Sequence, residues 1–324
     1  MTKPSKQLIW FSLTSIILLV ATAAIAINFT IIKDFFTGLA YRPTDEMSRI
    51  RTDLNLTDKG TLIFNATMPE LKEKSDFNTL CRGTETETAI LGCYRDDRVY
   101  VYDITDEELI GIRELTSAHE LLHAVYHRMS SQQKQELTDI LVQVYQENQD
   151  TLGEEIDLYQ DDQKKEEIYV RAGTEICDLP DELEKHYAEI FKNQDQIADY
   201  YKSYITVFKQ IEQNLETLLK KAQDLETEIT TKTAEYESGA TNLNQEIQEF
   251  NNCANTPNCF TSRWAFNNQR NALLNRQNEL ENLYNEINQL ISEYNTTATE
   301  YNENLLHGQA LNMAINSAEK ADQI

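Results

Sequence analysis

The sequence predicts an α+β domain followed by a long antiparallel α-helical coiled-coil hairpin. Its 324 residues suggest roughly two folded units. With only 9 Gly and 5 Pro, it has too few turn residues for an all-β fold of many strands. Its later part carries apolar residues spaced alternately by three and four, as coiled-coil helices do. The expected organisation is an N-terminal stub with a membrane helix at 1–30, the α+β domain at 31–195, the hairpin at 196–308 and a tail at 309–324.

The N-terminus predicts a membrane helix. Residues 8–27 contain no charged side chain, and about 20 such residues cross a bilayer as a helix. Lys3 and Lys6 precede them, so the positive-inside rule keeps the N-terminus cytoplasmic and the body outside. A cleaved signal peptide is the alternative, because Ala24 and Ala26 have the spacing of a cleavage site. We expect a single-pass membrane protein with an extracytoplasmic body, or a secreted protein under the alternative.

Charge and cysteine content limit the partners and the compartment. The chain carries 54 acidic and 29 basic side chains, for a net charge of -25, and this balance excludes nucleic acid as an expected partner. Four of the five cysteines form two local pairs. We expect disulfides Cys81–Cys93 and Cys253–Cys259, which are typical of an oxidising compartment, and a free Cys177.

Short elements are expected ahead of the hairpin. Hydrophobic patterning and turn residues predict strands at 60–66, 88–94 and 98–104, the last two joined by a hairpin loop at 95–97. They predict helices at 45–54, 69–80, 112–129, 131–147 and 163–177, and a further helix after Pro180. Thr105 and Glu108 fit a capping box.

Two long helical arms are expected from about residue 197 onward. The first arm repeats apolar residues by fours and threes between 204 and 229, and the second repeats them by sevens between 266 and 301. Residues 253–259 contain a proline and are expected to form the hairpin tip.

The predicted helix at 112–129 carries the motif HExxH, formed by His119, Glu120 and His123. Residues four apart lie on one face of a helix, so both imidazoles can bind one metal ion. Glu120 lies about 100° around the helix, where it can contact a metal-bound water without binding the metal. His127 lies one turn further on and cannot reach the same ion.

The alternative to a metal site is a pair of core histidines that hydrogen-bond to their neighbours. The helix is apolar on most of its circumference, which predicts that it is buried. Burying an unpaired polar group costs free energy, and a metal with its water would satisfy both imidazoles and the carboxylate together. We therefore favour zinc.

A catalytic zinc site needs a third protein ligand besides a water. No histidine occurs six residues after the motif, so the ligand is expected among acidic residues of a later helix. Glu175 is the first choice, because Gly173 beside it would let two helices approach closely. Glu166, Glu167 and Glu189 are the alternatives.

On these residues, the chain resembles the gluzincin group of metallopeptidases between about residues 45 and 191. In that group HExxH lies on one helix and a glutamate on a later helix completes the site. More narrowly, the runs 92–94, 98–103, 119–123 and 173–175 look like those of uncharacterised membrane-anchored bacterial proteins with predicted peptidase domains. The longer signature that follows the third ligand in better-known gluzincins is absent here.

The resemblance implies a zincin-like fold and one zinc ion per chain. His119, His123 and Glu175 would be the ligands, and Glu120 would be the base that activates a zinc-bound water for peptide-bond hydrolysis. Candidates for the donor to the developing oxyanion are Tyr187, His186 and Tyr169.

The expected partners are a peptide or protein substrate, the membrane through the N-terminal helix, and a protein partner of the coiled coil. The strand at 98–104 is the expected edge to which an extended substrate adds. A different function is also open. The chain would then be a cell-envelope scaffold in which the coiled coil is the working part and the zinc site is structural or inactive.

Overall fold

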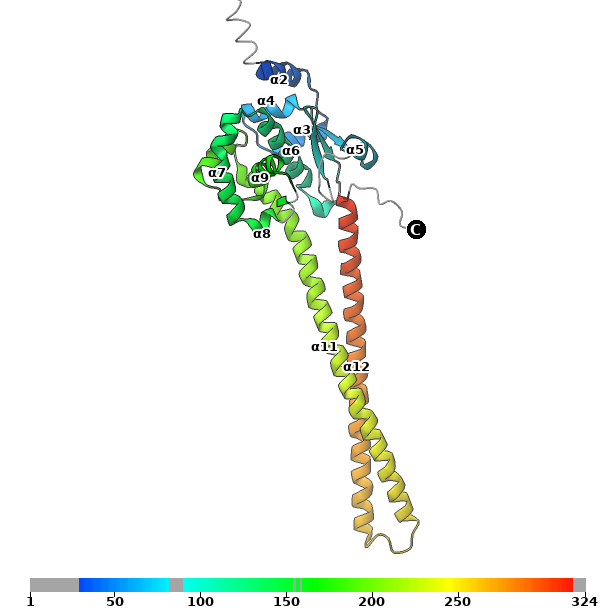
Figure 1. The fold of residues 1–324 in the computed structure, drawn as a ribbon. Coiled ribbons are helices and arrows are strands. Elements are labelled where there is room, and N and C mark those ends of the chain that lie inside the picture. The colour runs from blue at the N-terminus through cyan, green and yellow to red at the C-terminus, as the bar shows by residue number, and fades with distance from the viewer. Residues whose placement is uncertain (1–28, 82–89, 154–155, 158, 317–324) are drawn as a thin grey trace, which may run out of the picture. The chain divides into compact units, whose positions relative to one another are not determined.

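The computed structural model describes residues 29–81, 90–153, 156–157 and 159–316. The chain forms two compact units. The first comprises Met1–Val207 with Leu311–Ile324, and holds short helices and a small sheet. The second, Phe208–Ala310, is a helical hairpin (Figure 1). An α+β unit with a long helical hairpin was the predicted organisation.

The described part of the first unit begins with three helices, α2 (Phe29–Ala40), α3 (Asp45–Asp53) and α4 (Asp58–Ala66). The helix predicted at 45–54 is confirmed as α3, but the strand predicted at 60–66 is wrong, because that apolar run belongs to α4. The side chain of Thr57 accepts a hydrogen bond from the amide of Gly60 and thereby caps the helix. Residues 58–60 are consequently its first turn and do not form a loop before a strand.

A three-stranded mixed sheet follows, with β1 (Glu70–Lys72), β2 (Gly92–Arg95) and β3 (Arg98–Tyr102) in the order β1-β3-β2. β1 is parallel to β3, and β2 is antiparallel to it. The predicted hairpin between β2 and β3 is confirmed, although residues 88–89 of its first strand lie outside the described residues. The helix predicted at 69–80 is β1 followed by α5 (Lys74–Cys81).

β3 is the central strand, and this position corrects the expected substrate edge at 98–104. Its two neighbours, β1 and β2, already occupy both of its hydrogen-bonding sides. Among the described strands, β2 is outermost on the side of the hairpin.

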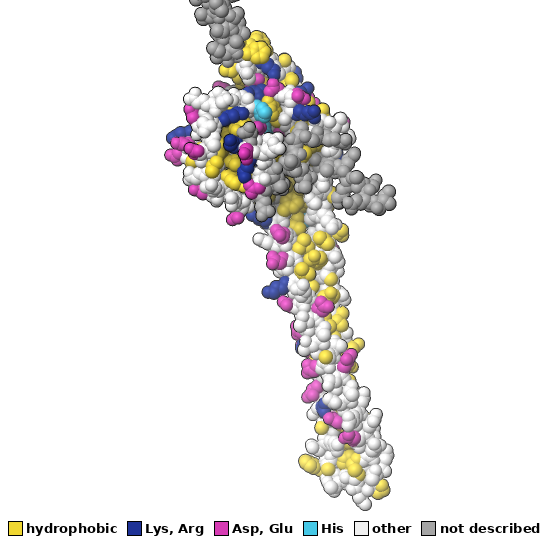
Figure 2. Space-filling model, viewed as in Figure 1, with side chains coloured by type: hydrophobic (Ala, Val, Ile, Leu, Met, Phe, Trp, Pro, Cys, Tyr) yellow, Lys and Arg dark blue, Asp and Glu magenta, His cyan; other side chains and the backbone are white. Residues whose placement is uncertain are grey.

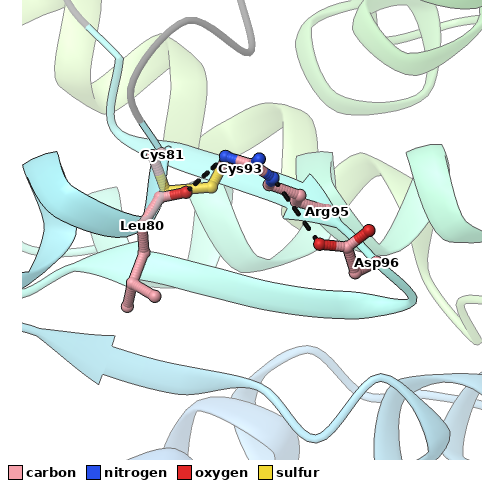
Figure 3. The surroundings of a disulfide bond; sticks show 5 residues. All are labelled: Leu80, Cys81, Cys93, Arg95 and Asp96. Carbon is pink, nitrogen blue, oxygen red and sulfur yellow. Dashed lines mark hydrogen bonds and ion pairs between the residues drawn. A yellow bond between two sulfur atoms is a disulfide. The ribbon is translucent and has the colours of Figure 1, made fainter.

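A disulfide between Cys81 and Cys93 joins α5 to β2 (Figure 3). Both cysteines lie with Phe77 in a buried cluster, and Arg95 donates a hydrogen bond to the carbonyl of Leu80 at 3.2 Å. The second predicted disulfide, Cys253–Cys259, is also present, and Cys177 is free. Two disulfides indicate an oxidising compartment.

The centre of the first unit is α6 (Ile112–Arg128), which packs against β2, β3 and α9 (Asp161–Glu175). The predicted burial of this helix is confirmed, since Leu121 and Leu122 are fully buried. Gly173 lets α9 approach closely, because a Cβ there would lie 2.6 Å from the side chain of Leu122. The remaining elements are η1 (Glu107–Leu109), α7 (Ser131–Glu147), α8 (Gln149–Leu152) and α10 (Asp181–Tyr187).

The capping residue at the start of η1 differs from the prediction. Asp106, rather than Thr105, accepts the hydrogen bond from the amide of Glu108. The helix predicted at 131–147 is confirmed as α7, where Ser130 and Gln133 form a capping box.

The predicted hairpin is formed by α11 (Gln194–Ala254) and α12 (Arg263–Ile315), and most of both helices belongs to the second unit. Leu225, Leu243 and Ile287 are buried along its seam. At the tip, the Cys253–Cys259 disulfide lies in the connection between the two helices. α12 continues to Ile315, into the range predicted as a tail.

The predicted localisation as a single-pass membrane protein needs correction. No helix among the described residues is long and apolar enough to span a bilayer. The run at residues 8–27, on which that prediction was based, lies outside the described residues.

Candidate metal centre

Three side chains from α6 and α9 converge on one point in the first unit. His119 and His123 lie one turn apart on α6, and their Nε2 atoms are 3.3 Å apart. Glu167, from the middle of α9, completes the group. Its Oε1 lies 3.5 Å from Nε2 of His119, and its Oε2 lies 3.6 Å from Nε2 of His123.

These distances fit a tetrahedral zinc ion. Zinc binds histidine nitrogen and carboxylate oxygen at about 2.0–2.2 Å, so tetrahedral ligand atoms lie about 3.3–3.5 Å apart. The two Nε2 atoms are 3.3 Å apart, and each has one oxygen of Glu167 at 3.5 or 3.6 Å. Two imidazoles and one carboxylate are also a donor set that catalytic zinc uses, with a fourth position left for water. The cluster therefore fits a metal ion of this size and coordination.

The electrostatics of the cluster favour the protonation states that metal binding requires. Burial lowers the pKa of His119 well below its ordinary value, which keeps the imidazole neutral. Nδ1 of His123 lies 2.8 Å from Oε1 of Glu166. Since a carboxylate accepts, Nδ1 donates and the lone pair of Nε2 points into the cluster.

Glu166 bridges two histidines on α6, because His127 Nε2 also lies 3.1 Å from its Oε1. Burial acts to raise the pKa of Glu166, but the hydrogen bonds from His123 and His127 outweigh burial and hold that pKa at about 2. The hydrogen bond between His127 and Glu166 also raises the pKa of His127. Glu166 therefore stays anionic and orients His123.

Glu166→Gln should weaken zinc binding about 10- to 100-fold, the usual effect of losing a residue that orients a metal ligand. The amide can still accept a hydrogen bond, but it lacks the charge that strengthens the contact with His123. Competition with a fluorescent zinc chelator measures the change. Glu147→Gln, the same chemical change at an exposed position of α7, is the control and should leave affinity unchanged. Equal affinity in Glu166→Gln and the wild type would contradict the orienting role.

Glu120 follows His119 on α6 and is not one of the three residues of the cluster. Its side chain is 2% exposed and lies against β2, where a Cβ on Gly92 would be 2.6 Å from Oε1 of Glu120. The carboxylate therefore lies between α6 and the outermost described strand.

Glu175, the predicted third ligand, does not join the cluster. Its carboxylate accepts two hydrogen bonds from Arg171, at 2.8 and 3.0 Å. Glu175 follows Glu167 by eight residues, which is about 12 Å along a helix. The structure thus selects Glu167, one of the sequence alternatives. Glu189 pairs instead with Lys59, and Glu166 binds the histidines from outside the cluster.

The predicted oxyanion donors lie in a buried aromatic group formed by Tyr126, Tyr169, His186 and Tyr187. The hydroxyl of Tyr187 donates to the carbonyl of Tyr169 at 2.6 Å, and the hydroxyl of Tyr169 lies 3.0 Å from Nε2 of His186. Neither tyrosine is exposed. Their hydroxyls are engaged in the core, which corrects their assignment as donors.

A pocket of about 260 Å³ opens beside the cluster. Its wall contains the ligands His123 and Glu167 together with residues from three parts of the chain: Tyr94 of β2, His127 of α6, and Tyr159, Gln163 and Glu166 at or before α9. Tyr94 and His127 pack their rings with centroids 5.3 Å apart. Tyr94, Tyr159 and Gln163 could not be assigned to the site from the sequence, because no short-range pattern connects β2 with α9.

The pocket thus gives the ligand cluster an opening bordered by the end of β2. Comparison with family models, with curated proteins and with solved structures finds no match to this chain.

Proposed function

We propose that this chain is a zinc-dependent peptidase of the zincin type, with His119, His123 and Glu167 as ligands. The observation that carries the proposal is the convergence of His119, His123 and Glu167, in which the two Nε2 atoms are 3.3 Å apart and each has an oxygen of Glu167 within 3.6 Å. The buried carboxylate of Glu120 lies on the same helix as the two histidines. A structural zinc site has no need of an additional acid next to the ligands. The HExxH motif supplies both features on one helix.

The chemistry divides between the metal and Glu120. A zinc ion held by these ligands would polarise a peptide carbonyl and lower the pKa of a water molecule. Glu120 accepts the proton from the attacking water at its carboxylate, and then delivers it to the nitrogen of the leaving amine. Glu166 holds the Nδ1 proton of His123 and so keeps the Nε2 lone pair directed at the metal.

An extended peptide is the substrate that best suits the strand beside the site. β2 is the outermost described strand on its side of the sheet, so an added strand can pair with the side of β2 that no described strand occupies. Gly92 brings this strand against Glu120, and Tyr94 brings it to the pocket wall. A peptide paired with β2 would therefore pass the base and the metal ligands.

Gly92→Ala should reduce peptide cleavage and leave zinc binding in place. The added methyl group would meet Oε1 and Cγ of Glu120 at 2.6 and 2.7 Å, so the carboxylate must move. The three atoms nearest to that methyl group belong to neither His119 nor His123, so both metal ligands should stay in place. Cleavage rates and zinc content of the same preparation measure both effects. An unchanged rate would contradict the contact between β2 and the base.

The proposal is tested by metal analysis combined with a cleavage assay. The wild-type chain should purify with zinc, cleave members of a broad peptide library, lose activity with a chelator and regain it with added zinc. His123→Ala should lose both the metal and the activity. A chain that takes up no zinc would exclude the metal centre.

A scaffold in the cell envelope is the second candidate function. The hairpin favours it, because helices of 61 and 53 residues extend well beyond what the metal centre uses. In this case the protein would hold zinc and cleave nothing across the library. Substitutions in the hairpin that abolish contacts with a partner protein would then impair the function.

A further inference from the structure

The polarity of α2 is inverted relative to that of an ordinary surface helix. Successive residues of an α-helix are turned by about 100°. The side of α2 that faces the first unit carries Asp34, whose side chain is buried, and Gly38, which packs against α4. By the same turn of about 100° per residue, the opposite side forms an arc of about 120° that has no charged residue. This arc contains Phe29, Ile32, Phe35, Phe36 and Leu39.

The apolar arc is exposed. Phe36 and Leu39 have 65% and 64% of their surface accessible, and the other three residues are exposed as well. Figure 2 shows hydrophobic side chains gathered on the surface over α2. A soluble helix normally turns its apolar side toward the core. This concentration of large apolar side chains on one helix marks a binding surface.

Polar contacts hold the helix in this orientation. Arg128, at the end of α6, donates to Asp34 from Nε and from a terminal nitrogen, at 2.7 and 3.0 Å. Both side chains are at most 11% exposed, so rotation of α2 would break a buried ion pair. Lys33 pairs with Asp97 next to it. The arc therefore faces away from α4 and α6, the neighbours of α2 within the first unit.

We propose that α2 lies flat on a lipid surface with this arc in the boundary between headgroups and acyl chains. Phenylalanine, isoleucine and leucine on one side of a short helix suit that boundary. The 28 residues ahead of α2 contain an uncharged apolar run that ends at residue 27, so only Asn28 separates this run from Phe29 of the arc. α2 has 12 residues, or about 18 Å, and so lies along the surface rather than across the bilayer of about 30 Å.

The binding is hydrophobic in origin. The net charge of -25 opposes attraction to anionic lipids, and the arc itself is uncharged. Vesicles of zwitterionic phosphatidylcholine, which carry no net charge, should therefore suffice.

Single tryptophans placed on two sides of α2 test this orientation. Both native tryptophans of the full chain are first replaced, by Trp10→Phe and Trp264→Phe. One variant then carries Phe36→Trp in the arc, and its matched control carries Thr30→Trp, about 120° away around the helix. In vesicles of phosphatidylcholine brominated near the headgroups, the tryptophan at 36 should lose much of its emission and shift to shorter wavelength. The tryptophan at 30 should stay bright.

Two results would overturn the proposal. Equal quenching at positions 30 and 36 would show that the arc is not oriented toward lipid. In the second result, the tryptophans remain unquenched at both positions while the wavelength shift at 36 grows with protein concentration. That result would show that a second copy of this chain covers the arc. Neither result bears on the metal centre, because the measurement uses no substrate.

Discussion

Glu120→Gln should reduce peptide cleavage by about 10²- to 10⁴-fold, the usual contribution of a general base. Glutamine has nearly the same shape as glutamate but cannot take up the proton of the attacking water. Glu120 is not among the ligand atoms of the cluster, so zinc affinity should stay close to that of the wild type. Initial rates at saturating zinc, with metal content measured on the same sample, separate the two properties.

Glu114→Gln is the matched control for this variant. It makes the same chemical change on the same helix, at a partly exposed position in the first turn of α6. Its rate should equal that of the wild type. If Glu120→Gln retained the wild-type rate, another residue would have to be the base.

The sequence was sufficient to predict the half of the site that lies on one helix. His119 and His123 are four residues apart, and helix geometry alone puts them on one face. The burial of α6 could also be predicted, because apolar residues surround the motif. Local periodicity determines both features, and neither depends on which other element packs nearby.

The third ligand could not be predicted from such local patterns. α9 carries three glutamates, at positions 166, 167 and 175, and each is a chemically suitable ligand. The packing of α9 against α6 decides among them, since it turns Glu167 to the cluster and Glu166 to Nδ1 of His123. Gly173 does mark the close approach of α9, as expected, but its neighbour Glu175 pairs with Arg171.

The misassigned strand has a similar origin. The apolar run at 60–66 is short, and short apolar runs occur in buried helices and in strands alike. The capping hydrogen bond from the amide of Gly60 to Thr57 distinguishes the two, and it favours helix α4. The hairpin was predictable for the opposite reason, since its repeat is maintained over many turns.

Glu167→Gln and Glu175→Gln should have opposite consequences, which makes the pair a direct test of the ligand set. Glu167→Gln replaces an anionic oxygen ligand with a neutral amide. Zinc affinity should fall by more than the roughly 10- to 100-fold that follows loss of an orienting residue, and cleavage should fall with it. Zinc titration against a chelator gives the affinity, and the rate at excess zinc shows how far added metal restores activity.

Glu175→Gln should keep zinc affinity and lower stability. Arg171 and Glu175 each have 9% of their side-chain surface exposed, and removal of the Glu175 charge breaks this ion pair while Arg171 stays buried. Breaking a buried ion pair in this way costs about 3–5 kcal/mol of the free energy of unfolding. Urea denaturation of the zinc-free variants measures this loss separately from metal binding. Should Glu175→Gln lose zinc while Glu167→Gln keeps it, the ligand set would be the one expected from the sequence, and α9 would have to pack differently against α6.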